Sequence, residues 1–130
     1  MKAIDTNVVL RIIANDDPVQ SPIAVALVEH QCVFVSLSVA MEVEWVLRSA
    51  YRWPSAAISN AMTAFAALDN VRMEEAERLG WAIERFRQGA DLADMVHIIA
   101  ARDMDGFISF ERKLAEEAGP DCPVPVERLA

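Results

Sequence analysis

Acidic residues placed near the ends of short apolar segments are the strongest chemical signal in the sequence. Asp5 ends the first such segment, and Ser109 and Glu111 follow a later one. Glu42 and Asp94 lie in the first turns of predicted helices. In open parallel sheets, ligands bind beyond the carboxyl ends of the strands, where loops and helix N-termini converge. We therefore expect these four carboxylates to meet at one edge of a sheet.

Clustered carboxylates without matching bases are typical of a site for Mg²⁺ or Mn²⁺, which are hard ions that prefer oxygen ligands. The absence of paired cysteines or histidines argues against zinc. Such an ion orients water in line with a phosphate, so the pattern indicates hydrolysis of a phosphodiester. A purely structural alternative exists for Asp5, because Asp, Thr6 and Asn7 all favour helix starts and turns.

The helical phase distinguishes the two acids of the segment SVAMEVEWVLR. At 100° per residue, Glu42 falls on a stripe of valines, whereas Glu44 points to the opposite side. A carboxylate on an apolar stripe needs a base, a proton or a metal ion shared with other carboxylates. We expect Glu42 to bind metal, with an ion pair to an arginine such as Arg11 as the alternative.

The segment GADLADMVHIIAA has two acids on one helical face. Asp91 stands where an N-cap belongs, and its side chain is expected to accept a hydrogen bond from the Asp94 amide. Asp94, one turn further, is the better metal ligand. His97 is expected to be a core residue and not a ligand.

Short apolar segments alternate with helical patterns along the whole chain. Strands are predicted at 2–4, 33–35, 71–73, 107–108 and, as a last edge strand, 124–126. Helices are predicted at about 8–13, 18–29, 36–51, 55–68, 74–88, 91–103 and 111–118. This alternation predicts an α/β fold with a short, mainly parallel central sheet flanked by helices on both sides.

The composition bounds the class of protein. With 130 residues, 54% of them hydrophobic and 25% charged, the chain matches a single globular domain over residues 1–130. It has no secretory signal and no apolar stretch approaching the roughly 20 residues of a membrane-spanning helix, so we expect a cytoplasmic protein. The net charge of −8 opposes nucleic-acid binding unless cations reverse the sign at a cluster of acids, or the acidic surface serves a basic protein partner.

Taken in order, four segments resemble the PIN domain family, in particular toxins of the VapC type. These segments are Asp5-Thr6-Asn7 after the first strand, SVAMEVEWVLR, GADLADMVHIIAA and GFISFERKL. The resemblance covers nearly the whole chain, and its specificity comes from the order of the four segments, since each alone is weak.

The resemblance implies a three-layer PIN-like fold and a Mg²⁺-dependent endoribonuclease, with Mn²⁺ as a substitute. The implied metal ligands are Asp5, Glu42 and Asp94, with Glu111 as a further catalytic acid. Supporting polar groups are Thr6, Asn7, Asp91 and Ser109. Glu111 departs from the family pattern, which usually has Asp there, so one well-held ion is expected.

The resemblance also implies partners. VapC-like toxins are typically homodimers, and a VapB-like antitoxin inhibits them by laying its C-terminal segment over the active site. The RNA substrate must be held by local basic residues, for which Arg11, Arg48 and Arg52 are candidates.

Two other functions remain open. Glu111 allows a PIN-like protein that has lost activity and only binds a partner. A phospho-receiver domain also uses acids at strand ends, but it needs a lysine after a late strand, and Lys113 already lies within a predicted helix.

Overall fold

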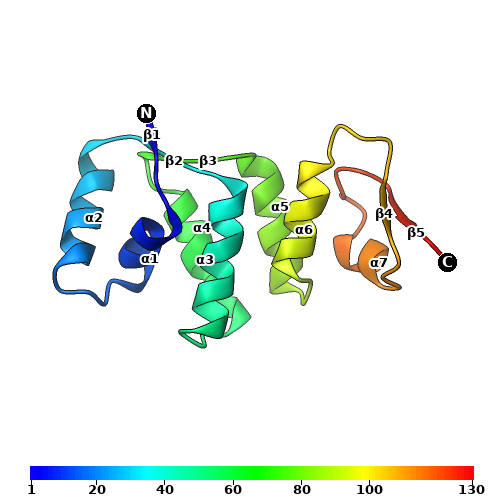
Figure 1. Cartoon of the computed structure of the whole chain (residues 1–130), viewed down its shortest axis with the longest axis horizontal. Coiled ribbons are helices and arrows are strands. Elements are labelled where there is room, and N and C mark those ends of the chain that lie inside the picture. Colours follow the sequence, from blue (N-terminus) through cyan, green and yellow to red (C-terminus); the bar gives the residue numbers. More distant parts are fainter. The chain divides into compact units, whose positions relative to one another are not determined.

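A computed structural model describes residues 1–130. The chain forms two compact units, residues 1–76 (unit 1) and residues 77–130 (unit 2). In Figure 1, unit 1 begins with the blue strand at the N-terminus and unit 2 ends with the red strand at the C-terminus.

Unit 1 contains a three-stranded parallel sheet in the order β1-β2-β3. The strands are β1 (Lys2–Ala3), β2 (Val33–Val35) and β3 (Val71–Met73). The central strand places Val33 opposite Val71 and Val35 opposite Met73. Val33 and Val35 are each 1% exposed, whereas Phe34 on the other face is half-buried. The period of two thus gives β2 one face that is completely covered.

Four helices belong to unit 1, and α1 (Thr6–Ala14) contacts the three others. These are α2 (Gln20–His30), α3 (Leu37–Ser49) and α4 (Ser55–Ala66). Side chains cap the two helices that follow strands: Asp5 accepts the Val8 amide at the start of α1, and Ser36 accepts the Val39 amide at the start of α3. The capping bonds satisfy amides that the first turn leaves without partners.

Asp17 organises the entry to α2. Its Oδ1 accepts the backbone amides of Val19 at 2.9 Å and Gln20 at 2.7 Å. These two hydrogen bonds, that of Gln20 first, lower the pKa of Asp17 from its usual value. Asp17 thus marks the entry to the helix predicted at 18–29, although α2 begins at Gln20.

Glu74 lies directly after β3 and outside any helix, because α5 begins at Ala76. The prediction of a helix from residue 74 is wrong by two residues. The Glu74 amide donates to the Val35 carbonyl, and its Oε1 accepts the Leu37 amide, both at 2.8 Å. Glu74 therefore fixes the end of β3 to the first residue of α3.

Unit 2 contains a two-stranded parallel sheet formed by β4 (Phe107–Ser109) and β5 (Val126–Arg128). Its helices are α5 (Ala76–Arg87), α6 (Leu92–Ala100) and the short α7 (Leu114–Ala118). Helix α7 therefore starts three residues later than the helix predicted at 111–118. The strand predicted at 124–126 lies at 126–128 instead.

The C-terminal end of α7 is held by two side chains of α5. Trp81 Nε1 donates to the Ala118 carbonyl at 3.1 Å, and Arg85 Nε donates to the Glu117 carbonyl at 2.6 Å. Gly119 follows with φ +76°, and a Cβ there would lie 2.9 Å from the Arg85 guanidinium carbon. The glycine thus provides both the left-handed backbone and the space for Arg85.

The predicted fold class is confirmed: the chain is α/β with short strands that pair in parallel. None of its helices has the length and apolar character that crossing a membrane requires.

We predict that Glu74→Ala lowers the free energy of unfolding by about 2 kcal/mol, because it removes a charge-assisted hydrogen bond to the Leu37 amide. Glu74→Gln keeps an acceptor oxygen and should cost less than half as much. Urea denaturation followed by circular dichroism measures both. Equal losses for the two variants would contradict the assigned role of the hydrogen bond.

Candidate functional site

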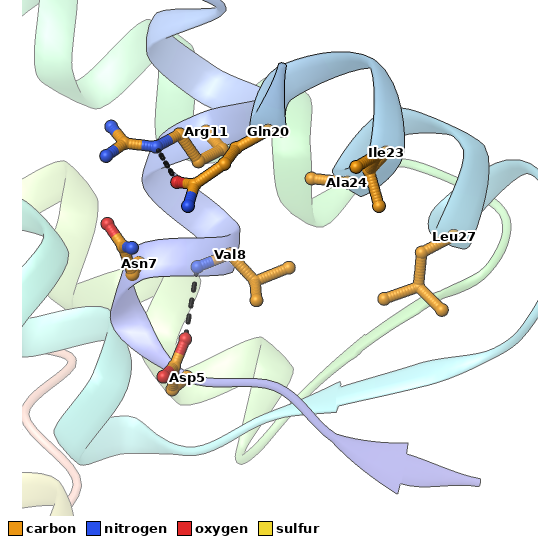
Figure 2. Close-up of a pocket in the computed structure, with 8 residues that line it drawn as sticks. All are labelled: Asp5, Asn7, Val8, Arg11, Gln20, Ile23, Ala24 and Leu27. Carbon is orange, nitrogen blue, oxygen red and sulfur yellow. Dashed lines mark hydrogen bonds between the residues drawn. The ribbon is translucent and has the colours of Figure 1, made fainter. Parts of the chain in front are cut away.

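Asp5 links the sheet of unit 1 to helix α1. The chain leaves β1, Ile4 donates its amide to the Phe34 carbonyl, and Asp5 then takes the extended conformation of an N-cap. Its Oδ1 accepts the Val8 amide at 3.1 Å, while no hydrogen bond occupies Oδ2 (Figure 2). The expectation that Asp5 could be a capping residue is thus correct, and the cap leaves one carboxylate oxygen available to a ligand.

Thr6 connects Asp5 to the acid of α3. The Thr6 hydroxyl donates a hydrogen bond to Glu42 Oε1. This bond fixes one carboxylate oxygen of Glu42 and leaves Oε2 without a hydrogen-bond partner. Residues 36 positions apart in the sequence are therefore joined by a side-chain contact within unit 1.

Asp5, Thr6, Asn7 and Glu42 line a shallow depression with a volume of about 430 Å³. Leu10 and Val46 supply its apolar part. The Asn7 side chain is exposed and makes no hydrogen bond. The structure thus brings together all four sequence-predicted site residues of unit 1, with polar oxygens that face solvent.

The predicted faces of α3 are wrong for its two acids. Glu42 is exposed, whereas Glu44 is only 3% exposed and accepts a hydrogen bond from Arg48 Nε at 2.8 Å. The buried positions of α3 are Leu37, Ala40, Val43, Glu44 and Leu47. The valine stripe was misleading because this helix is apolar almost all round, which leaves its phase poorly defined by sequence.

The alternative partner of Glu42 is also excluded. Arg11 donates its Nε to Gln20 Oε1 at 2.6 Å and lies 3.9 Å from Asp17 Oδ2. Arg11 therefore binds α2 and the loop before it, and the predicted ion pair with Glu42 is wrong.

In unit 2, Asp91 caps α6 as the sequence predicted. Asp91 Oδ1 accepts the Asp94 amide at 3.0 Å. Asp94 itself is half-buried in the first turn of α6, and His97 is exposed. The prediction of a core role for His97 is therefore wrong.

The pKa of Asp94 is raised above its ordinary value of 3.8. Burial is the largest cause, followed by the charge of Asp91 and, more weakly, that of Glu111, while His97 acts in the opposite direction. The three acids of unit 2 are thus close enough for their charges to oppose one another. A group of acids in this condition is stabilised by a cation.

Ser109 and Glu111 form a turn after β4. The Ser109 hydroxyl accepts the Glu111 amide at 3.0 Å, and the Glu111 side chain is exposed. Ser109 therefore sets the backbone direction at Glu111, which precedes α7.

The sequence-predicted acids divide between the units, Asp5 and Glu42 in unit 1 and Asp91, Asp94 and Glu111 in unit 2. Neither unit by itself gathers three His, Cys, Asp or Glu side chains in a geometry that holds a metal ion. The donors present are carboxylate, hydroxyl and amide oxygens, and this chemistry fits a hard divalent ion such as Mg²⁺.

Sequence reasoning missed Glu74 as a residue that supports this region. Glu74 follows a strand directly, so the rule that selected Asp5 would also have selected it. It was assigned to the next helix because the residues after it are good helix formers.

A model of the PIN domain family matches residues 2–119 of the chain. Proteins of that family are generally nucleases that depend on divalent metal ions. Comparisons with curated proteins and with solved structures found no significant match.

We predict that Asp94 ionises at a higher pH than 3.8 in the metal-free protein, as measured by carbon NMR of its carboxyl group. Asp91→Asn keeps an N-capping oxygen but removes a negative charge, so it should lower the pKa of Asp94. Since the folded pKa is raised, the contribution of Asp94 to stability is full below 3.8 and is lost as the pH rises through the folded value. An unchanged titration in Asp91→Asn would contradict the charge coupling.

Proposed function

Because the chain belongs to the PIN domain family, we propose that it is a Mg²⁺-dependent endoribonuclease and the toxin of a VapBC-type toxin-antitoxin pair. The observation that carries the proposal is the depression of unit 1, where Asp5, Thr6, Asn7 and Glu42 lie together. These residues lie in the first two of the four segments that resemble the family, Asp5-Thr6-Asn7 and SVAMEVEWVLR. Their free carboxylate oxygens are the ligands that Mg²⁺ prefers.

The proposal assigns Asp5, Glu42 and Asp94 to the metal ion and Glu111 to a further acidic position that acts through water. Asp5 and Glu42 come from unit 1 and Asp94 and Glu111 from unit 2, and the family match runs over all four. We propose that the two units act as one functional domain. The longer side chain of Glu111, where Asp is usual, favours one firmly held ion.

The reaction is the hydrolysis of a phosphodiester in RNA. Mg²⁺, when bound, lowers the pKa of water and stabilises negative charge at the phosphate. Water adds to phosphorus, the bond from phosphorus to the 3′ oxygen breaks, and that oxygen takes up a proton. The products are a 5′-phosphate and a 3′-hydroxyl.

The chain's own residues prepare this reaction. Thr6 holds Glu42 through one oxygen and so directs the other oxygen toward the depression. Ser109 sets the direction of Glu111, and Asp91 fixes the first turn of α6 at Asp94. Each is a positioning residue, because it acts through a carboxylate and not on the substrate.

We propose a homodimer in the cytoplasm that a VapB-like antitoxin inhibits. The net charge of −8 supports a basic inhibitory segment, since cationic side chains among the carboxylates would replace the metal ion. Mn²⁺ is expected to substitute for Mg²⁺, because both take oxygen ligands.

We predict that Asp5→Asn lowers the rate of RNA cleavage by at least about 100-fold, since several kcal/mol of charge stabilisation depend on the ion. Asn is as good an N-cap as Asp, so the bond from the Val8 amide and the fold should persist. The assay mixes antitoxin-free protein with RNA and Mg²⁺ or Mn²⁺.

The matched control is Asp16→Asn, which removes an exposed acid beyond the C-terminal end of α1. It should leave cleavage unchanged. Cleavage that persists without divalent metal, or full activity of Asp5→Asn, would show that the chain is not a nuclease of this kind. Mn²⁺ binding without cleavage would indicate the inactive binding module.

We predict that Thr6→Val weakens Mn²⁺ binding by about 10-fold, because partners that orient a ligand typically contribute 10- to 100-fold to metal affinity. Thr6→Ser keeps the hydroxyl and should restore most of the affinity. Calorimetric titration measures the dissociation constants, with Thr63→Val on an exposed part of α4 as the control. Equal affinity in Thr6→Val and Thr6→Ser would rule out the positioning role.

A further inference from the structure

A groove of about 470 Å³ runs between α1 and α2 and includes Asp5 at one end. Figure 2 shows its lining, which we call the α1–α2 groove. The lining residues are Asp5, Asn7, Val8, Arg11, Gln20, Ile23, Ala24 and Leu27. Its volume lies in the range of sites for small organic ligands. Of the carboxylates that form the proposed metal site, only Asp5 lines the groove.

The groove has a polar side and an apolar side. Figure 2 places the polar ends of Asn7, Arg11 and Gln20 together, while Ile23 and Leu27 extend from α2 along the other side. Ile23 is 66% exposed and so presents an accessible apolar surface to an occupant of the groove. An occupant of the groove thus needs a flat apolar face and polar edges.

The polar side offers donor groups in addition to the one that Arg11 already uses for Gln20 and Asp17. Arg11 uses Nε for Gln20 Oε1, and both of its terminal nitrogens remain without a hydrogen bond. The Asn7 side chain makes no hydrogen bond, and neither does the amide nitrogen of Gln20. A guanidinium with two available nitrogens matches a phosphate, which accepts two parallel hydrogen bonds.

We propose that the α1–α2 groove binds one nucleotide of single-stranded RNA next to the cleaved bond. The base lies against the apolar side, the amides of Asn7 and Gln20 contact its edge, and Arg11 binds its phosphate. Unpaired bases are recognised by apolar or stacking contact on their faces and hydrogen bonds on their edges. This inference rests on the proposed nuclease function, because Asp5 joins the groove to the metal site.

The chemistry of the groove favours RNA over a peptide as its occupant. Arg11, which also lies 3.9 Å from Asp17 Oδ2, places a cation in the lining of the groove in a chain with net charge −8, where phosphates need local compensation. Asp5 and Asn7 line both the groove and the depression of the proposed site, and the proposal places one RNA strand across the two.

The first test measures binding of a fluorescently labelled, mixed-sequence single-stranded RNA by anisotropy, with EDTA present so that no cleavage occurs. Ile23→Asp should weaken binding by about 10-fold, because it places a carboxylate on the wall that contacts the base. Val19→Asp is the matched control, since Val19 is 68% exposed beside α2 and does not line the groove. It should bind as the unaltered protein does.

A second variant addresses the phosphate contact. Arg11→Gln should reduce the slope of the logarithm of affinity against the logarithm of salt concentration by about 0.7, the value for one phosphate of a single strand. Circular dichroism checks that each variant is folded. Gln20→Ala, at an exposed position, should change the preferred base at one position beside the cut when cleavage of a randomised RNA is sequenced.

The outcomes separate the two proposals. Selective loss in Ile23→Asp together with the reduced salt slope supports the groove as a nucleotide site, even if the protein cleaves no RNA and the nuclease proposal fails. Cleavage with unchanged affinity in Ile23→Asp and Arg11→Gln overturns the groove proposal and leaves the nuclease proposal standing. Absence of RNA binding by the unaltered protein also overturns it, and loss of binding to a protein partner in Ile23→Asp alone would identify a protein-docking surface.

Discussion

The backbone amides at helix N-termini, which have no partner within the helix, determine the positions of several acids and hydroxyls in this protein. The first amides of a helix have no partner within the helix, and in three helices of this chain a side chain at the N-cap accepts one of them. Asp5 does so for α1, Ser36 for α3 and Asp91 for α6. The same requirement that starts the helices therefore places acids and hydroxyls at the edges where a ligand can approach.

Capping and ligand binding are compatible because a carboxylate has two oxygens. Asp5 uses Oδ1 for the Val8 amide and leaves Oδ2 without a hydrogen bond. Glu74 repeats the arrangement from a distance, since it leaves β3 and accepts the Leu37 amide at the start of α3. A carboxylate that caps a helix through one oxygen thus keeps the other available to a ligand.

The surroundings of Asp94 disfavour its ionised carboxylate. Burial and the charges of Asp91 and Glu111 raise its pKa, and the hydrogen bond from its own amide to Asp91 holds it in that position. At neutral pH an ionised Asp94 opposes folding of the metal-free protein. Carboxyl groups whose surroundings disfavour the ionised form are common at functional sites.

Local signals in the sequence were sufficient for most elements of the fold. The observed starts of α2 and α3 lie within two residues of those predicted, Asp91 caps α6 as predicted, and the short segments 33–35 and 71–73 form β2 and β3, because caps and strand composition act within a few residues. The start of α7 was missed by three residues, since Glu111 has a good helix propensity but its amide is bound by the Ser109 hydroxyl. Side-chain hydrogen bonds of this kind override propensity and are hard to read from sequence.

The features that sequence could not supply depend on contacts between distant segments. Glu42 and Glu44 differ by only two positions in a helix that is apolar almost all round, so the tertiary environment decides which is exposed and which pairs with Arg48. Likewise, Arg11 binds Gln20, and Thr6 binds Glu42, across separations that no local pattern encodes. The α1–α2 groove arises from the same cause: Val8 and Leu27 are ordinary apolar residues in the sequence, and only the packing of two helices makes them one wall beside a carboxylate.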